Sequence, residues 1–253
     1  MRISAIGLSV LLLSSCFAPA QTQQQDIVAR RAHLLHRGVN ASMWFAQAGD
    51  YSPARLRNYT TADDIALMHS MGFDHVRLSI DGDELVRGAA PDGLNIAFVA
   101  ELDRALHIML QDDLRVIVDV HPTDGFKRQL RTNDAAATRF CALWKALAGH
   151  YANTDSERVF FEVLNEPEFT DAQQWNAVEA RAIAAIRKAA PNHTIIATAL
   201  HYSGLTDLLM LEPVADSNVI YTFHDYEPFA FTHQGATWTM AQVQTLRRVP
   251  YPS

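Results

Sequence analysis

The sequence contains only two cysteines, Cys16 and Cys141, among its 253 residues. Cys16 lies in an N-terminal segment with the features of an export signal. Removal of that segment would leave Cys141 without an internal disulfide partner. Cys141 falls in a helical pattern with Phe140 and Trp144. We therefore interpret it as a buried structural thiol and not as a nucleophile.

An excess of positive charge is also absent, since the formal net charge is -7. Proteins that bind nucleic acid need a basic face that releases counterions from the phosphates, so we expect no nucleic-acid partner. The remaining composition, 49% hydrophobic and 19% charged, is ordinary for a globular protein. The length fits one large domain.

No apolar run is long enough to cross a bilayer as a helix. Residues 1–20 combine Arg2, a largely apolar run over residues 3–13 and small residues, which is the layout of a secretory signal peptide. Cleavage after Ala20 would leave Gln21 first. Residues 13–16 resemble a bacterial lipobox, which would instead place a lipid anchor on Cys16. We expect a secreted or periplasmic protein, or alternatively one anchored to the cell envelope through Cys16.

From about residue 35 onward, short apolar segments alternate with longer amphipathic ones. Nearly continuous apolar runs, such as residues 116–118 and 159–161, suit parallel strands that are covered on both faces. No linker or internal repeat interrupts the pattern, so residues 21–253 read as one domain. We expect strands over residues 34–39, 75–80, 114–120, 158–164, 194–200 and 218–223. We expect helices over 61–71, 96–111, 133–151 and 172–190, with a weaker one over 206–211.

Polar side chains lie at or near the carboxyl end of every expected strand. In a (β/α)8 barrel these ends meet at one rim, where active sites lie, whereas a doubly wound sheet gathers ligands only at its switch point. No glycine-rich phosphate fingerprint follows the first strand. The sequence therefore predicts an α/β fold, a (β/α)8 barrel of which about six βα units are present. Its rim residues are Asn40, Arg77, His121, Asn165 with Glu166, His201, and His224 with Tyr226.

The sharpest motif is Asn165-Glu166-Pro167, which follows a strongly apolar strand. Proline cannot continue the ladder of backbone hydrogen bonds, so the chain leaves the sheet there. A carboxyl group that is partly desolvated at the barrel mouth has a raised pKa, as a general acid requires. The motif alone is also compatible with a surface glutamate before a loop proline.

Other segments of the sequence accompany this motif. Together they resemble the cellulase-like family 5 of the glycoside hydrolases. The resemblance covers residues 34 to about 240 and rests on segments in the right order: Arg37-Gly38-Val39-Asn40, Val76-Arg77-Leu78, Val118-Asp119-Val120-His121, Leu164-Asn165-Glu166-Pro167 and His224-Asp225-Tyr226.

That resemblance implies a retaining, endo-β-1,4-glucanase-like hydrolase, in which two carboxyl groups lie roughly 5–5.5 Å apart. Glu166 would be the acid/base and Asn165 would bind the sugar 2-hydroxyl. Arg77 and Tyr226 would orient the nucleophile, while His121 and His224 would bind hydroxyls or tune Glu166. Trp44 would stack on a sugar, although it could equally pack against the barrel mouth. The resemblance implies a polysaccharide or oligosaccharide substrate, no cofactor and no metal.

The nucleophile itself, expected as a glutamate after strand 7, has no counterpart before Ser253, so we interpret the barrel as C-terminally incomplete. Glu162 lies four residues before Glu166 on the same strand, roughly 13 Å down the barrel at about 3.3 Å per residue. It is therefore too far from Glu166 to attack the same sugar carbon. Asp225 and Glu227 do not match the family position. A non-catalytic glycan-binding or decayed barrel is the alternative, and a metal-dependent barrel hydrolase that uses His201 and His224 is a weaker one.

Overall fold

The computed structural model describes residues 20–90 and 93–252. The expected signal peptide and Cys16 fall almost wholly on residues 1–19 and lie outside the described residues. Within the described part, no helix is both long enough and apolar enough to cross a membrane.

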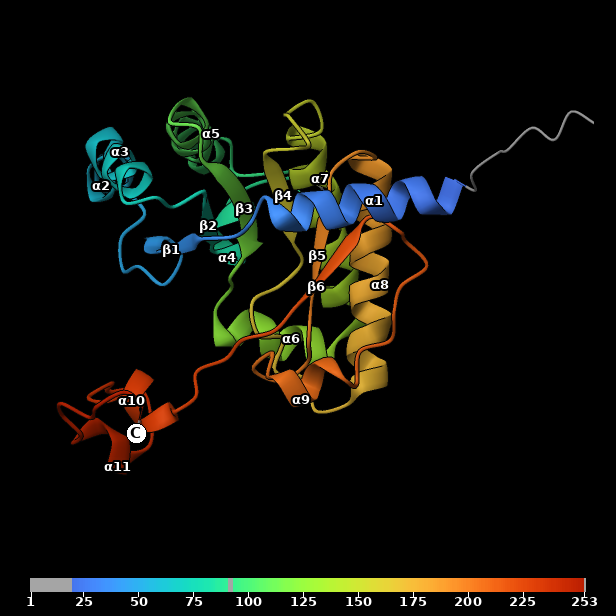
Figure 1. Cartoon of the computed structure of the whole chain (residues 1–253). Helices are drawn as coiled ribbons and strands as arrows, with labels where there is room; N and C mark the ends of the chain where they lie inside the picture. The colour runs from blue at the N-terminus through green and yellow to red at the C-terminus, as the bar shows by residue number, and fades with distance from the viewer. Residues whose placement is uncertain (1–19, 91–92, 253) are drawn as a thin grey trace, which may run out of the picture.

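The described residues form one sheet of six parallel strands that follow one another in sequence order (Figure 1). Successive strands are joined by helical segments on the outside of the sheet, which is the arrangement of a (β/α)8 barrel. In the described part of the chain β1 and β6 are the outer strands, and the predicted incomplete barrel is confirmed. The strands are β1 Gly38–Phe45, β2 His75–Ile80, β3 Arg115–Val120, β4 Val159–Glu162, β5 Ile195–Thr198 and β6 Val219–Thr222.

The first strand lies later in the chain than the predicted 34–39, so that boundary was wrong. Leu34 and Leu35 instead close the turn after the preceding helix, because their N–H groups donate to carbonyls of that helix. β1 begins at Gly38, which pairs with His75. A Cβ atom on Gly38 would lie 2.1 Å from Nε2 of His75, so the absence of a side chain permits this close approach.

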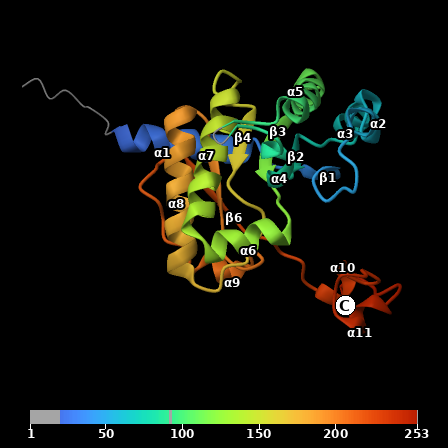
Figure 2. The same ribbon diagram turned by 180° about the vertical axis from the view of Figure 1, so that it is seen from behind.

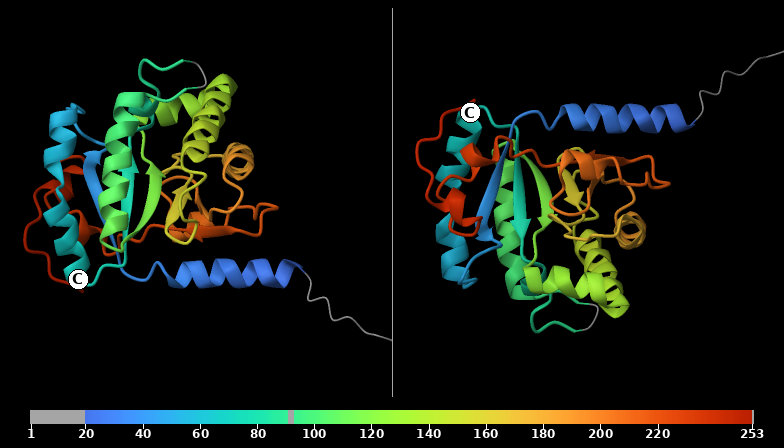
Figure 3. Two further views of the ribbon diagram at one scale, coloured as in Figure 1. Left: turned by 90° about the horizontal axis from the view of Figure 1, so that it is seen from above. Right: turned by 90° about the horizontal axis from the view of Figure 1, so that it is seen from below.

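The predicted helices are all present, and the four longer ones cover the outer face of the sheet (Figure 3). Thr61 caps the first of them with a capping box, in which its side chain and that of Asp64 each bond the other's backbone N–H. The helices are α3 Ala62–Ser70, α5 Ile96–Gln111, α7 Asp134–His150 and α8 Ala172–Ala189, and the weaker one is the short α9 Leu205–Leu208.

Six further helices had no counterpart in the sequence prediction, and most of them are short or rich in polar residues. They are α1 Ala20–His33, α2 Pro53–Tyr59, α4 Gly82–Val86, α6 Asp124–Thr132, α10 Phe229–Thr232 and α11 Ala241–Gln244. The last two belong to a segment that projects from the sheet after β6 (Figure 2).

α1 crosses the amino-terminal ends of β4 and β5, on the other side of the sheet from α7 and α8 (Figure 3). Its Arg31 is 5% exposed and donates to Glu157 and to the Thr194 hydroxyl, at 2.9 and 3.0 Å. Arg31 also donates to the carbonyl of Asn192 at 2.7 Å. This buried cation ties the helix to the end of the barrel opposite the rim.

Two groups of apolar side chains are buried, and they differ greatly in size. The large one lies between the sheet and the outer helices and includes Trp144 and Trp175. The small one lies on the inner face of the sheet and consists of Ile117, Phe160 and Ile196. Charged residues lie above this small cluster, toward the rim, and they build the candidate site.

Cys141 packs on the large core and is only partly buried. Burial raises the pKa of its thiol, which leaves it protonated and unreactive at neutral pH. This agrees with the structural role that was predicted, although the side chain is less enclosed than expected.

Candidate active site

Glu166 lies where the chain turns out of the sheet after β4. The backbone N–H of Asn165 still donates to the carbonyl of Val120, at 2.9 Å, and Glu166 then takes a φ of 43°. A long side chain in this left-handed region costs on the order of 1–3 kcal/mol, and such strain concentrates at functional sites. The conformation is therefore a first structural argument that Glu166 has a function.

The carboxylate of Glu166 is bound by His224, which follows β6. Nδ1 of His224 lies 2.9 Å from Oε1 of Glu166. Burial alone would raise the pKa of Glu166, but the hydrogen bond and charge of His224, with Lys127 and His121 nearby, lower it below its ordinary value. The raised pKa that we expected from desolvation is thus wrong for these residues, because the positive surroundings outweigh it.

Lys127 was not foreseen from the sequence, because α6 is mostly charged and was not predicted. Its side chain is 6% exposed, and Nζ lies 3.1 Å from Oε1 of Glu168. Arg131, one turn further along α6, binds the other oxygen of the same carboxylate at 3.1 Å. Thr123, the N-cap of α6, followed by Phe126 and then by Leu130 at the helical i,i+4 spacing, is the signal that could have revealed the helix.

Arg77 connects β2 to the residues around Glu166. Its guanidinium binds both oxygens of Glu162, at 2.7 and 2.6 Å, and donates to Oδ1 of Asn165 at 3.0 Å. Burial alone would lower the pKa of Arg77, but the charges of Asp119 and Glu162 raise it, so the cation is permanent. The role expected for Arg77 was to orient a nucleophile; in this structure it holds Glu162.

Asn165 and His121 lie side by side, directly next to Glu166. Nδ2 of Asn165 is 3.2 Å from Nε2 of His121. Asn165 is 3% exposed, whereas the side chain of His121 is 15% exposed. The structure thus brings together five predicted site residues, Glu166, His224, Arg77, Asn165 and His121, from β2, β3, β4 and the end of β6.

Tyr226 lies at the open side of this group. The residue is 47% exposed, and its ring stands edge-on to the ring of His224, with the ring centres 6.1 Å apart. Burial and the charge of Glu166 raise the pKa of the Tyr226 hydroxyl. The phenol is therefore a hydrogen-bond donor at neutral pH.

Trp44 is not available to a ligand, and its prediction as a sugar-stacking residue was wrong. The side chain is 0% exposed, and its indole N–H donates to the carbonyl of Leu56 at 2.7 Å. Trp44 belongs to the large core, in the part of β1 where the pairing with β2 is irregular. Trp238, by contrast, is 82% exposed in the segment after β6.

His201 also follows a strand, but it pairs elsewhere. Its Nδ1 lies 2.7 Å from Oδ1 of Asp207, and no hydrogen bond joins it to Glu166 among the described residues. Within residues 20–90 and 93–252, no group of three or more histidine, cysteine, aspartate or glutamate side chains has a geometry that could hold a metal ion.

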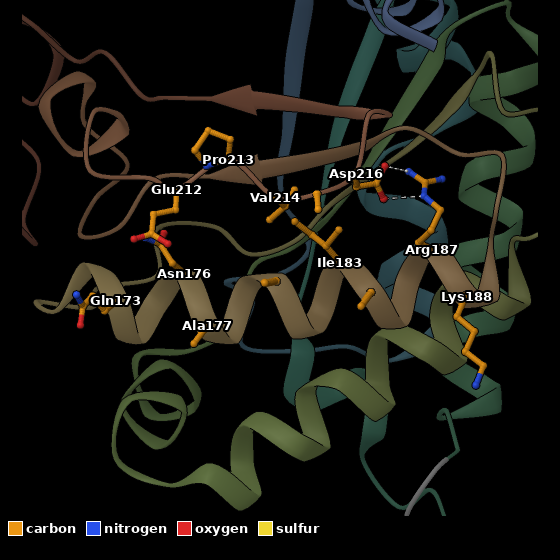
Figure 4. Close-up of a pocket in the computed structure, with 13 residues that line it drawn as sticks. Gln173, Asn176, Ala177, Ile183, Arg187, Lys188, Glu212, Pro213, Val214 and Asp216 are labelled. Carbon is orange, nitrogen blue, oxygen red and sulfur yellow. Dashed lines mark hydrogen bonds and ion pairs between the residues drawn. The ribbon is translucent and has the colours of Figure 1, made fainter. Parts of the chain in front are cut away.

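A hollow of about 450 Å³ opens from the rim into the interior of the sheet. Its walls carry Asn40, Arg77, Glu162, Thr222, His224 and Tyr226. Another hollow lies on the outer surface, between α8 and residues 212–216 (Figure 4). Its lining is mostly apolar, and its Arg187 and Asp216 are already paired at 2.8 Å, so the interior hollow is the candidate ligand site.

The carboxylates on and beside this hollow each have partners of their own. Glu162 is 2% exposed and bound by Arg77 below the rim. Asp225 and Glu227 are exposed and accept backbone N–H groups of their own loop, at 3.0 Å each.

The cellulase family, glycosyl hydrolase family 5, matches residues 36–248 of this sequence. The chain belongs to glycosyl hydrolase family 5. It is 34% identical to cellodextrinase A of Ruminococcus flavefaciens over 216 residues, which are 80% of this chain and 62% of that protein. It is 30% identical to endoglucanase C of Acetivibrio thermocellus over 226 residues, 85% of this chain and 64% of that protein. The chain thus spans less than two thirds of the length of these relatives.

The fold is also that of solved members of the family. Cel5A of Thermotoga maritima superposes with a TM-score of 0.77 at 28% identity, covering 89% of this chain and 72% of that one. The six parallel strands therefore correspond to part of a family 5 (β/α)8 barrel.

Proposed function

We propose that this chain is part of a retaining endo-β-1,4-glucanase-like hydrolase in which Glu166 is the acid/base. The observation that carries the proposal is the carboxylate of Glu166 at the barrel rim, which lies 2.9 Å from Nδ1 of His224 beside the buried amide of Asn165, on a backbone with a positive φ. The matched relatives are named as endoglucanases and a cellodextrinase. Cel5A of Thermotoga maritima has been solved with cellobiose and with mannotriose, which supports glucan and mannan as candidate substrates.

The proposed mechanism begins with protonation of the glycosidic oxygen by Glu166 while a second carboxylate attacks the anomeric carbon from the other face. Asn165 would hydrogen-bond the sugar 2-hydroxyl. Arg77 and Tyr226 present donors toward the open side of the barrel, where they would orient the attacking carboxylate. Water would then hydrolyse the glycosyl-enzyme, with Glu166 acting as the base.

We further infer that the attacking carboxylate is not among these 253 residues. A proton donor needs a pKa near the working pH, and a neighbouring negative charge raises the pKa of a carboxyl group. The pKa of Glu166 is instead lowered here, because the hydrogen bond and charge of His224 and the charges of Lys127 and His121 outweigh burial. A missing carboxylate beside Arg77 and Tyr226 would supply that charge.

Glycan binding without hydrolysis is the second candidate, and two exposed aromatic residues favour it. Tyr226 and Trp238 are both available to contact sugars. We also propose that the protein is exported. N-terminal sequencing of the exported chain distinguishes Gln21 as the first residue from a lipidated Cys16.

The experiment uses an extended chain, defined as residues 21–253 followed by the part of Acetivibrio thermocellus endoglucanase C that lies beyond the matched region. The extended chain should release oligosaccharides from carboxymethyl cellulose or mannan, and proton NMR should show the β-anomer first. The 253-residue chain should release none. Hydrolysis by the 253-residue chain, or an α-anomer formed first by the extended chain, would contradict the proposal.

A further inference from the structure

Two buried carboxylates, Asp119 and Glu162, lie under the rim, and the proposed chemistry uses neither of them. Asp119 is 0% exposed and Glu162 is 2% exposed, and they face each other on the neighbouring strands β3 and β4. We propose that Asp119 is a positioning residue, which fixes the tautomer of His121 and through it the orientation of the Asn165 amide. This inference rests on the proposed function, because its value lies in how Asn165 meets a sugar.

The geometry is a closed ring of four side chains. Oδ2 of Asp119 lies 3.2 Å from Nδ1 of His121 and 3.1 Å from a guanidinium nitrogen of Arg77. Nε2 of His121 lies 3.2 Å from Nδ2 of Asn165, and Oδ1 of Asn165 lies 3.0 Å from the same guanidinium nitrogen of Arg77. Each member therefore contacts two others.

Only one assignment of hydrogens satisfies the ring. Arg77 donates only and an ionised carboxylate accepts only, so Nδ1 of His121 must carry the hydrogen that Asp119 accepts. Nε2 of neutral His121 is then an acceptor, which requires the NH2 group of Asn165 to point toward it. The Asn165 oxygen accepts from Arg77, and the second hydrogen of its NH2 group remains for a ligand.

Asp119 is ionised, as this assignment requires. Burial alone would raise its pKa, but the charge of Arg77 and the hydrogen bond from His121 hold the pKa below its ordinary value. The other charged groups that act on the cluster are Glu162, which Arg77 binds with two hydrogen bonds, and His224.

A contribution to the stability of the fold does not explain why the carboxylate of Asp119 is buried. Its Oδ1 is buried beside the hydroxyl of Ser79 on the neighbouring strand, which helps to lower the pKa of Asp119 but does not reach Oδ1 at hydrogen-bond distance. A buried ion pair adds little to stability compared with apolar side chains of similar volume, and an unpartnered buried oxygen costs free energy. Arg77 already has an acceptor in Glu162, to which it donates two hydrogen bonds. What Asp119 adds is an acceptor placed against Nδ1 of His121.

The test reads the tautomer directly, by solid-state ¹⁵N NMR of the histidine side chains in the 253-residue chain, because this readout tolerates oligomers. The His121 signals are assigned by their loss in His121→Gln, and spectra are taken over a pH series that isolates the neutral imidazole. We expect the unaltered chain to carry the hydrogen on Nδ1. Asp119→Ala should shift the population of neutral His121 at least fivefold toward the hydrogen on Nε2, the form that free histidine prefers.

Glu162→Gln is the matched control, since it removes a carboxylate of the same cluster that has no hydrogen bond to His121. It should leave the tautomer unchanged. A hydrogen on Nε2 in the unaltered chain would overturn the inference, even if Asp119→Ala failed to fold. So would an unchanged tautomer in a folded Asp119→Ala variant. Because this readout needs no hydrolysis, failure of the proposed activity in the extended chain would not be confused with failure here.

Discussion

Nδ1 of His224 lies 2.9 Å from Oε1 of Glu166. A histidine that follows β6 therefore binds the carboxylate of a residue that follows β4. This contact spans two strands of the sheet and depends on the fold. It gives Glu166 a fixed direction at the rim, and it lowers the pKa of the carboxyl group.

His224→Ala should therefore raise the pKa of Glu166, as measured by ¹³C NMR of its carboxyl carbon. His201→Ala is the matched control, because His201 is a rim histidine that pairs with Asp207. The pKa of Glu166 in the folded state lies below its unfolded value of about 4.3, so its contribution to stability is present above that pH and is lost as the pH falls through the folded pKa. The stability deficit of His224→Ala should accordingly shrink below about pH 4.

Glu179 should make the protein less stable as the pH rises. Burial raises its pKa to about 8, against about 4.3 in the unfolded chain, so between these values only the folded state holds the proton. Stability must then fall with pH across this window, because the unfolded state binds fewer protons.

Glu179→Gln mimics the protonated carboxyl and can still accept from the N–H of Thr198, which lies 2.8 Å from Oε1 of Glu179. It should stabilise the chain at pH 9 by on the order of 3–5 kcal/mol and change little at pH 4. Urea unfolding at the two pH values measures this. Equal effects at both would refute a buried, titrating carboxyl.

Arg31→Ala should destabilise the chain by about 3 kcal/mol, because it leaves buried acceptors at the ends of β4 and β5 without their donor. Arg30→Ala is the control, since Arg30 binds the same Glu157 from an exposed position. Thermal or urea unfolding should separate the two variants clearly. Similar small losses would mean that α1 does not secure the barrel.

Most of the sheet was predictable from the sequence, whereas its first strand and several helices were not. β2 to β6 are short apolar runs, and their polar end residues fall at the rim as expected. β1 was misplaced because Leu34 and Leu35 look like strand residues but close a turn, while the true strand starts at a glycine that only its contact with His75 explains. α6 was missed because its charged residues, Lys127 and Arg131, are paired in the tertiary structure.

The candidate site divides in a similar way. Motif residues such as Glu166 and His224 could be placed together, because parallel strands bring their carboxyl ends to one rim. The burial of Trp44 and the lowered pKa of Glu166 could not be foreseen. The first depends on the contact of Trp44 with Leu56. The second depends on how closely His224 and Lys127 approach Glu166, which no local pattern records.

The 253-residue chain should associate with itself. The outer strands β1 and β6 leave backbone groups unpaired among the described residues, and Phe223 beside β6 is 44% exposed. Such edges pair with other chains. Light scattering after gel filtration should show oligomers or aggregate, and Val39→Lys on β1 should reduce them. A sharply melting monomer would contradict this expectation.

The most direct test of the central claim, that Glu166 is the acid/base, compares two substrates in the extended chain with and without Glu166→Gln. Cellopentaose has a poor leaving group that needs a proton, whereas a dinitrophenyl cellobioside does not. Pre-steady-state kinetics should show that the variant loses glycosylation on cellopentaose by at least about 100-fold and far less on the dinitrophenyl substrate. Equal losses on both substrates in that step would contradict the account.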